Sequence, residues 1–324
     1  MSRCSFTFSA NTGGALHLGP FRIWYDALHR RKVPSFSTLS PALLEAVEAD
    51  PAFSAPDMIY FSHCHPDHFS RSLLISALER WPTAHAVLPE QRLPNQVLLT
   101  GQTVDFSSGD LHLRFRRLLH EGPQYAQLPH YGCLLQYRDY RVLLTGYCAV
   151  ACDDLAELID GAPIDVALLN FPWLTLPRGR AAISDWIRPR HLLIGHLPFQ
   201  EDDRWGYRPA AQRAMDKLPA VADIRLLLEP LQGEEFLDFC CVEPIIGARV
   251  CSWYCCYANA YPFCDLWIIY SDKKNPDFPP SEIHEGYPHG VAARYQGTLC
   301  IACDLDVDFD ELAEFIAGSG ALVW

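Results

Sequence analysis

Residues 63–68, HCHPDH, place four side chains that can bind a metal ion within six positions. Neutral imidazoles and carboxylates are good ligands for zinc, and the same set also suits iron or manganese. On a tight loop fixed by Pro66, His63 and His65 can point to one side, while Asp67 and His68 turn toward a second metal ion. Only 13 of the 324 residues are histidine, so three in six positions are improbable in an arbitrary polar loop. The segment therefore predicts a metal centre.

The elements before this segment are short and read as strands and turns. Residues 15–26 predict a hairpin with a turn at Gly19-Pro20, and Asp26 ends its second strand. A helix is expected at residues 41–49, with Pro41 at its first helical position. Residues 58–62 (MIYFS) are too short for a helix and predict a buried strand that leads into the metal-binding loop.

The pattern after the segment changes from hairpins to alternating helices and strands. A helix is expected at residues 70–81. Strands are expected at 84–89, 97–106, 111–119, 131–137 and 141–145. Residues 153–159 and 180–187 then predict helices, and residues 166–170 and 191–195 predict strands. Two sheets packed between layers of helices would produce this order.

From about residue 231 the composition changes, because 8 of the 13 cysteines follow, from Cys240 to Cys303. We expect a boundary near residues 235–248 that separates a domain at 1–240 from a small Cys- and aromatic-rich α/β domain at 241–324. Its last part predicts a strand at 298–304, a helix at 309–317 and a strand at 321–324. Cys251, Cys255, Cys256 and Cys264 lack the spacing of a structural zinc site, which favours a packed core.

The overall composition limits the partners. The chain is 49% hydrophobic and 20% charged, which is typical of a globular protein. Its formal net charge of −13 disfavours binding to nucleic acid or to an anionic membrane. We see no signal peptide and no apolar run long enough to span a membrane, so we expect a cytoplasmic protein with free thiols. The sequence gives no indication of an oligomeric state.

The motifs together resemble the metallo-β-lactamase superfamily of metal-dependent hydrolases. HCHPDH after a strand resembles the family's H-x-H-x-D-H signature, and the hairpin ending in Trp24-Tyr25-Asp26 is similar to its opening strands. Residues 143–146 (LLTG) resemble a strand that normally ends in Thr-Gly-Asp, and residues 192–196 (LLIGH) a strand ending in the last metal-binding histidine. The resemblance covers residues 12–196 and is closest to the branch that includes ascorbate-6-phosphate lactonase. It implies an αββα sandwich.

The resemblance also implies two divalent metal ions, most often zinc, with manganese or iron as alternatives. His63 and His65 would hold the first ion, and Asp67 and His68 the second. The remaining ligands would be His196 for the second site and a middle histidine. We favour His120 for that role because it follows a strand and opens a loop, and His130 remains the alternative.

One position departs from the family pattern. The carboxylate that normally bridges the two metals should follow Thr145-Gly146, and the chain has Tyr147 there. Tyr147 could act as a ligand or proton donor, Cys148 could supply a thiolate instead, or one metal ion could be weak or missing. Loss of one negative charge between two dications predicts weaker binding of the second metal.

The predicted function is hydrolysis of a small ester, lactone or phosphodiester by a metal-activated water, with Asp67 orienting or deprotonating that water. The alternatives are a mononuclear or non-catalytic descendant that acts as a binding or scaffolding protein, and an RNA-processing nuclease, which the net charge disfavours. Asp26 could support a metal ligand from behind. Arg178 and Arg180 could bind an anionic small-molecule substrate. His17 and His29 are expected on the surface or behind the ligands.

Overall fold

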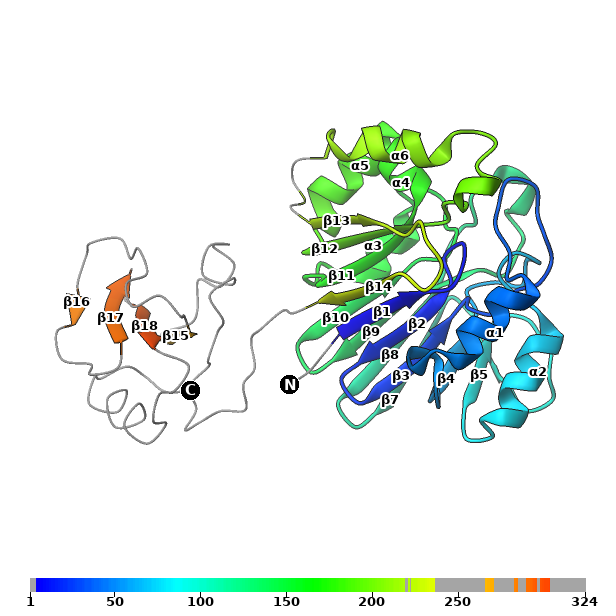
Figure 1. The fold of residues 1–324 in the computed structure, drawn as a ribbon, viewed down its shortest axis with the longest axis horizontal. Coiled ribbons are helices and arrows are strands. Elements are labelled where there is room, and N and C mark those ends of the chain that lie inside the picture. Colours follow the sequence, from blue (N-terminus) through cyan, green and yellow to red (C-terminus); the bar gives the residue numbers. More distant parts are fainter. Residues whose placement is uncertain are drawn as a thin grey trace. The chain divides into compact units, whose positions relative to one another are not determined.

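The structure is a computed structural model that describes residues 4–218, 221 and 223–236 in full, together with the backbone of four strands further along the chain. Two sheets of seven strands each form the first part (Figure 1). The first sheet has the order β14 (Gly233–Phe236), β1 (Cys4–Phe8), β2 (Gly14–Leu18), β3 (Phe21–Tyr25), β4 (Met58–Tyr60), β5 (His85–Leu88) and β6 (Val97–Leu98). The second has the order β13 (Asp223–Leu226), β12 (His191–Gly195), β11 (Val166–Asn170), β10 (Tyr140–Leu144), β9 (Tyr131–Tyr137), β8 (Leu111–Arg117) and β7 (Thr103–Ser108).

Helices cover the outer faces of both sheets, as the sequence predicts. Helices α1 (Pro41–Ala49) and α2 (Arg71–Arg80) bury Val47, Leu73 and Leu74 in the core that also fills the space between the sheets. A second core lies between the second sheet and the remaining helices, which are α3 (Asp153–Ile159), α4 (Phe171–Thr175), α5 (Pro177–Ala182) and α6 (Tyr207–Met215). The expected αββα sandwich is confirmed.

The side chains of the second sheet point alternately to its two faces, and each face packs in a different hydrophobic core. In β10, Val142 and Leu144 belong to the core between the sheets, and Leu143 belongs to the core under the helices. Successive side chains of a strand point to opposite faces, so a strand buried on both faces reads as a continuous apolar run. This is why β10, β11 and β12 could be placed from the sequence.

Two predicted elements are wrong in part. The single strand expected at residues 97–106 is two strands, because the chain turns at Gly101 (φ 83°) and passes from β6 in the first sheet to β7 in the second. The helix expected at 180–187 begins earlier, at Pro177, and its last five residues form a π-helix, Ile183–Ile187. Helices α4 and α6 and strands β1, β13 and β14 were not predicted.

The C-terminal part is a separate unit. Contacts divide the chain into a unit of Arg3–Phe236 and another that contains Leu237–Trp324. The described strands of the latter form a sheet in the order β15 (Leu266–Tyr270), β18 (Thr298–Cys303), β17 (Gly290–Tyr295) and β16 (Ile283–His284). The strand expected at 298–304 is confirmed. The elements expected at 309–317 and 321–324, and the cysteines from Cys251 to Cys264, lie outside the described residues.

Parallel pairing brings the site-bearing loops to one edge of the sandwich. Strand β3 pairs in parallel with β4, and β10 pairs in parallel with β11 and β11 with β12. The loops that follow β3, β4, β10 and β12 therefore leave the sheets at their carboxyl ends. In the part of the chain that the structure describes, none of the helices has the length and apolar character needed to span a bilayer.

The turn after β10 depends on a glycine. Gly146 has φ 60°, and its amide donates to the Tyr25 hydroxyl on the opposite sheet. A Cβ at this position would lie 2.6 Å from both Ser62 Oγ and His130 Nε2. A side chain here would therefore be disfavoured both by the left-handed backbone and by lack of space.

We predict that Gly146→Ala lowers the free energy of unfolding by about 2–4 kcal/mol, from a left-handed residue and an overpacked contact. Gly161→Ala is the matched control, because Gly161 has φ 67° and a Cβ added there would meet no atom within 4 Å. Gly161→Ala should lower the free energy of unfolding by only about 1 kcal/mol, from the left-handed backbone alone. Urea unfolding measures both, and equal losses would contradict the crowding.

Candidate metal centre

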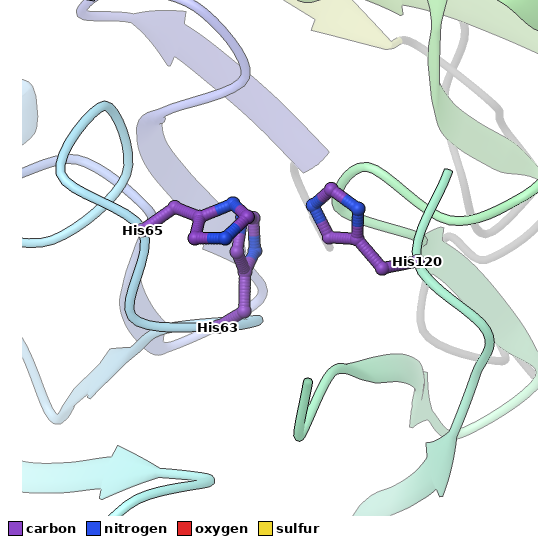
Figure 2. Close-up of side chains that lie close together, drawn as sticks. All are labelled: His63, His65 and His120. Atoms are coloured by element: carbon purple, nitrogen blue, oxygen red, sulfur yellow. The ribbon is translucent and has the colours of Figure 1, made fainter. Parts of the chain in front are cut away.

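Three histidines from the two sheets converge in the first group. His63 and His65 lie in the loop after β4, and His120 follows β8 across the sandwich (Figure 2). One nitrogen of each ring lies within 4.8 Å of the others. Figure 2 shows the rings of His63 and His65 on one side of a small space and the ring of His120 on the other. Such an arrangement can hold one metal ion.

Fixed hydrogen bonds orient two of these rings. His63 Nδ1 lies 2.9 Å from Ser62 Oγ, and His120 Nδ1 lies 2.7 Å from the carbonyl oxygen of Glu121, to which it donates. The Nε2 atoms of His63 and His120 are buried and have no hydrogen-bond partner. A buried polar nitrogen without a partner is costly unless something binds it. The donor set therefore fits a metal ion.

The second group contains Asp67, His68 and His196. His68 Nε2 and His196 Nε2 lie 3.0 Å apart, and Asp67 Oδ2 lies 3.9 Å and 3.6 Å from these two atoms respectively. Ligands about 2.0–2.1 Å from a tetrahedral ion would lie about 3.3 Å from one another. The observed separations bracket this value. The ring centroids of His63 and His68 are 4.0 Å apart, so the two groups adjoin.

Asp26 holds the second group from behind. Its carboxylate lies 3.0 Å from His68 Nδ1 and accepts hydrogen bonds from the Ser62 amide (2.8 Å) and hydroxyl (2.6 Å). The first contact makes His68 Nδ1 the donor and leaves His68 Nε2 as the acceptor that faces His196. Such a carboxylate fixes the tautomer and raises the basicity of the imidazole. Because Ser62 also contacts His63, this one carboxylate supports both groups.

Three residues that belong to the ligand groups or contact them have a left-handed backbone conformation. Asn11, Asp26 and His196 have φ values of 57°, 43° and 59°. The His196 amide donates to the Asn11 carbonyl (2.6 Å), and the Asn11 side chain donates to the carbonyl of Asp67 (2.9 Å). This conformation costs free energy for a residue other than glycine, and non-glycine residues that adopt it occur preferentially at functional sites. The loop after β1 thus ties together the two segments that carry the second group.

Burial and mutual repulsion keep most of the histidines neutral. Burial, together with nearby histidines, lowers the pKa of His120 to about 4 and that of His196 to about 3. Burial also lowers the pKa of His63, and His68 adds to this effect. Burial opposes ionisation of Asp67, but His68 and His196 outweigh it and lower the pKa of Asp67. At neutral pH the site thus offers neutral imidazoles at His63, His120 and His196 and an ionised carboxylate at Asp67, which are the forms that bind metals. Burial lowers the pKa of His68, but Asp67 and Asp26 outweigh burial and raise it, so a metal ion at this ring would have to displace a proton.

His130 is buried beside the first group but is not one of its members. Its Nε2 accepts the Tyr147 amide at 3.2 Å, and its ring centroid lies 5.1 Å from that of His63. The other ring nitrogen, Nδ1, is buried without a hydrogen-bond partner, but His130 belongs to none of the ligand groups among the described residues. Between the two histidines that the sequence leaves open, the geometry brings His120 together with His63 and His65.

Tyr147 lies at the centre of the site without a charge. Its ring stacks on that of His196 at a centroid distance of 4.2 Å and meets the ring of His120 at 5.4 Å. Burial raises the pKa of the Tyr147 phenol, and Glu121 raises it further, so the hydroxyl remains protonated. Cys148, the thiolate alternative, packs in the core under the helices, where burial raises the pKa of its thiol, and it belongs to none of the ligand groups among the described residues.

Other candidates are supporting residues. His17 contacts the Ala52 carbonyl at 2.8 Å, and His29, predicted on the surface or behind the ligands, is fully buried beside Asn11. Arg180 Nη1 donates to the carbonyls of Leu174 and Thr175, and its binding to an anionic substrate stays a prediction. Arg178 is exposed and lies 3.9 Å from Glu121.

Sequence reasoning missed several residues that build the site. Asn11 and Ser62 act through hydrogen bonds, and neither belongs to a metal-binding residue type. The loop between Asp26 and α1 contributes Phe36, whose ring lies 4.2 Å from that of His196. Tyr125 lies 4.8 Å from His65 and 4.9 Å from His120. The Asn-Thr-Gly-Gly turn after the first strand was the one available signal of a close approach in this region.

The chain is similar to solved structures in its fold, although its sequence matches no known family. No family model matches the sequence, and no curated protein matches it. Igni18, a metallo hydrolase from the archaeon Ignicoccus hospitalis KIN4/I, superposes with a TM-score of 0.53 at 14% identity, over 72% of this chain and 99% of that one. An isothiocyanate hydrolase from Delia radicum gut bacteria gives 0.52 at 11% identity, over 72% and 99%. YhfI of Bacillus subtilis, a metallo-β-lactamase fold protein, gives 0.50 at 11% identity, over 73% and 100%.

These similarities establish the fold. The chain has the metallo-β-lactamase fold, and the resemblance predicted from its motifs is confirmed at that level. Solved structures of metal-dependent hydrolases share this sandwich, and the chain combines it with groups of His and Asp side chains that could hold metal ions.

We predict that Asp26→Asn weakens metal binding about 10–100-fold, because His68 loses the carboxylate that fixes its tautomer. Competition with a chromophoric chelator measures the affinity. Asp57→Asn is the matched control, since Asp57 accepts the Arg22 amide at the opposite end of β4. An Asp26→Asn protein with unchanged affinity would show that the contact to His68 does not support a metal ligand.

Proposed function

We propose that the chain is a metal-dependent hydrolase that cleaves a small ester, lactone or phosphodiester with a metal-activated water. The observation that carries this proposal is the pair of adjoining ligand groups, one of which contains two buried histidine nitrogens without partners. His63, His65 and His120 would hold one divalent ion, and Asp67, His68 and His196 the other. Zinc suits this donor set best, with manganese or iron as alternatives.

The bound ions would supply Lewis acidity and lower the pKa of a coordinated water. The protein residues do the rest. Asp67, ionised at neutral pH, accepts a hydrogen bond from the attacking water and orients it toward the substrate. Tyr147 keeps its proton and is half-buried between the two groups, so it can donate that proton to the leaving oxygen. Ser62 and Asp26 hold the imidazoles in place.

Tyr147 also changes the charge balance that the proposal requires. Asp67 is the one carboxylate of the two donor groups, and a carboxylate oxygen of Asp26 lies within 4.8 Å of ring nitrogens of His63 and His68. A bridging carboxylate at position 147 would add a further negative charge between two dications. We therefore propose that the second ion to bind is held less tightly than the first, because no bridging carboxylate offsets the repulsion between the two dications. Cys64, Cys133, Cys148 and Cys152 form no disulfide, which supports a reducing, cytoplasmic location as part of the same proposal.

The competing proposal is a non-catalytic descendant of the fold that binds or scaffolds a partner. Tyr147 is the observation in its favour, because a neutral phenol replaces the ligand that would join two metals. A nuclease is disfavoured by the formal net charge of −13. A protein that binds no metal ion would support the non-catalytic proposal, and metal-dependent turnover would support the enzyme.

We predict that His120→Asn lowers metal-dependent hydrolysis of p-nitrophenyl esters, lactones or bis(p-nitrophenyl) phosphate by about 100-fold or more, beyond the 10–100-fold typical of changes behind the ligands. His17→Asn is the control, because His17 binds the Ala52 carbonyl away from the ligand groups. If His130→Asn abolishes turnover while His120→Asn retains it, our choice of the middle ligand is wrong.

We further predict that Tyr147→Asp raises the affinity for the second metal ion, because it restores a carboxylate beside His120 and His196. Titration with zinc followed by elemental analysis measures the change, and Tyr147→Phe separates the charge from the loss of the hydroxyl. If Tyr147→Asp lowers both occupancy and turnover, Tyr147 is an adapted functional residue and not a weakened ligand position.

A further inference from the structure

The donor groups lie among aromatic rings. Tyr125 meets the rings of His65 and His120 at centroid distances of 4.8 Å and 4.9 Å, both edge to face. On the other side, Phe36 meets His196 edge-on at 4.2 Å, and Tyr147 stacks on the same imidazole at 4.2 Å. Aromatic rings therefore contact members of both donor groups.

These rings continue outward as a connected surface. Tyr207 stacks on Phe36 at a centroid distance of 6.4 Å and lies 4.6 Å from Phe171. Tyr125 is 38% exposed, and Phe36, Tyr147 and Tyr207 are half-buried, so part of each ring faces solvent or a ligand. We call Phe36, Tyr125, Tyr147 and Tyr207 the aromatic wall. They come from four separate segments, which indicates that the tertiary fold assembles this surface.

In the described part of the chain, Lys and Arg are not among the leading electrostatic neighbours of the donor groups. The strongest electrostatic neighbours of the histidines in both groups and of Asp67 are other histidines, Asp67, Asp26 and Glu90, with no Lys or Arg among them. Glu121, beside His120, adds an acidic group close to the Tyr147 ring. Arg178 is 60% exposed at its side chain and lies 3.9 Å from Glu121, and Arg180 is engaged by backbone carbonyls.

This combination selects among the substrates of the proposed hydrolase. Proteins usually bind phosphate oxygens through Arg, Lys or backbone amides, which form short charge-assisted hydrogen bonds. Aromatic rings instead bind flat apolar groups in offset or edge-to-face contacts. We infer that the site takes an uncharged carboxylic ester with an aryl or similarly flat apolar substituent, in preference to a phosphodiester. This inference rests on the proposed function.

The reaction would balance as an ordinary ester hydrolysis. Water adds its oxygen to the carbonyl carbon, and the bond from that carbon to the alkoxy or aryloxy oxygen breaks. One proton ends on the leaving oxygen, which gives a free alcohol or phenol, and the other product is a carboxylic acid. The aromatic wall would hold the flat substituent during these steps and exclude water from it. Phe36, Tyr125 and Tyr207 are specificity-determining residues in this account.

The test compares phenyl acetate, ethyl acetate and bis(p-nitrophenyl) phosphate with the full-length protein and added zinc or manganese. Each kcat/KM is divided by the rate constant for hydroxide-catalysed hydrolysis of the same compound, which removes intrinsic reactivity. We expect phenyl acetate to exceed both other substrates by about tenfold or more, from two or more aromatic contacts. Tyr125→Leu should raise the KM for phenyl acetate about fivefold and leave that for ethyl acetate unchanged.

Two controls make the Tyr125 result specific. Tyr125→Phe keeps the ring and should keep the preference. Phe106→Leu removes a ring that is also 38% exposed but lies on β7, against Phe115, and should leave turnover unchanged. Binding of acetophenone and of 2-butanone, two uncharged ketones, gives a readout without turnover, and acetophenone should bind more tightly and lose this advantage in Tyr125→Leu.

The outcomes separate this inference from the proposed function. Metal-dependent cleavage with equal normalised rates for the two acetates, or a preference for the phosphodiester, would overturn the inference and leave the hydrolase standing. Failure to cleave any of the three substrates, in a protein that binds no metal ion, would contradict the hydrolase and the inference with it. Equal binding of the two ketones would overturn the role of the aromatic wall in either case.

Discussion

A buried carboxylate beside buried imidazoles is the contact on which the rest of the site depends. Asp26 is 1% exposed, and its oxygens are shared between Ser62 and His68. Such a charge is stable in a protein interior only when it is well hydrogen-bonded. By accepting from His68 Nδ1, it fixes which nitrogen of that ring faces inward. Through Ser62 the same carboxylate reaches the His63 ring, so one buried anion orients members of both donor groups.

The fold brings distant segments to this anion. The hairpin of β2 and β3 ends at Asp26, and β4 leads into His63 one strand further along the same sheet. The other sheet delivers His120 after β8 and His196 after β12. The group of His63, His65 and His120 and the group of Asp67, His68 and His196 each draw residues from both sheets. Asn11, Asp26 and His196, which have left-handed backbone conformations, lie where these segments meet. The packing of the sandwich compensates for the free-energy cost of that conformation.

Part of this arrangement could be predicted from the sequence. The HCHPDH segment, the buried strands β10, β11 and β12 and the start of α1 at Pro41 have local signals, and each is present in the structure. The expected boundary at residue 240 and the ligand roles of the site residues stay predictions. The preference for His120 over His130 rested on its position after a strand and at the start of a loop. The structure brings His120 together with His63 and His65, whereas His130 Nε2 accepts the Tyr147 amide.

Other features could not be predicted because they arise only from tertiary contacts. Phe36 and Tyr125 lie in segments without the periodicity of a strand or an amphipathic helix. Their role depends on contacts with the rings of His196 and His65, which are distant in sequence. Residues 97–106 alternate like one strand, but the chain changes sheets within them. The departure at Tyr147 was visible in the sequence, and its consequence was not, since that depends on the neutral, stacked position of the phenol against His196.

Whether these side chains form a metal centre is tested most directly by elemental analysis of protein purified without chelator. We expect between one and two zinc, manganese or iron ions per chain, with a sharp fall in His63→Ala, because His63 contributes a buried nitrogen with no other partner. A wild-type chain that carries no metal ion, even after incubation with zinc, would contradict the metal centre and would favour a non-catalytic descendant of the fold.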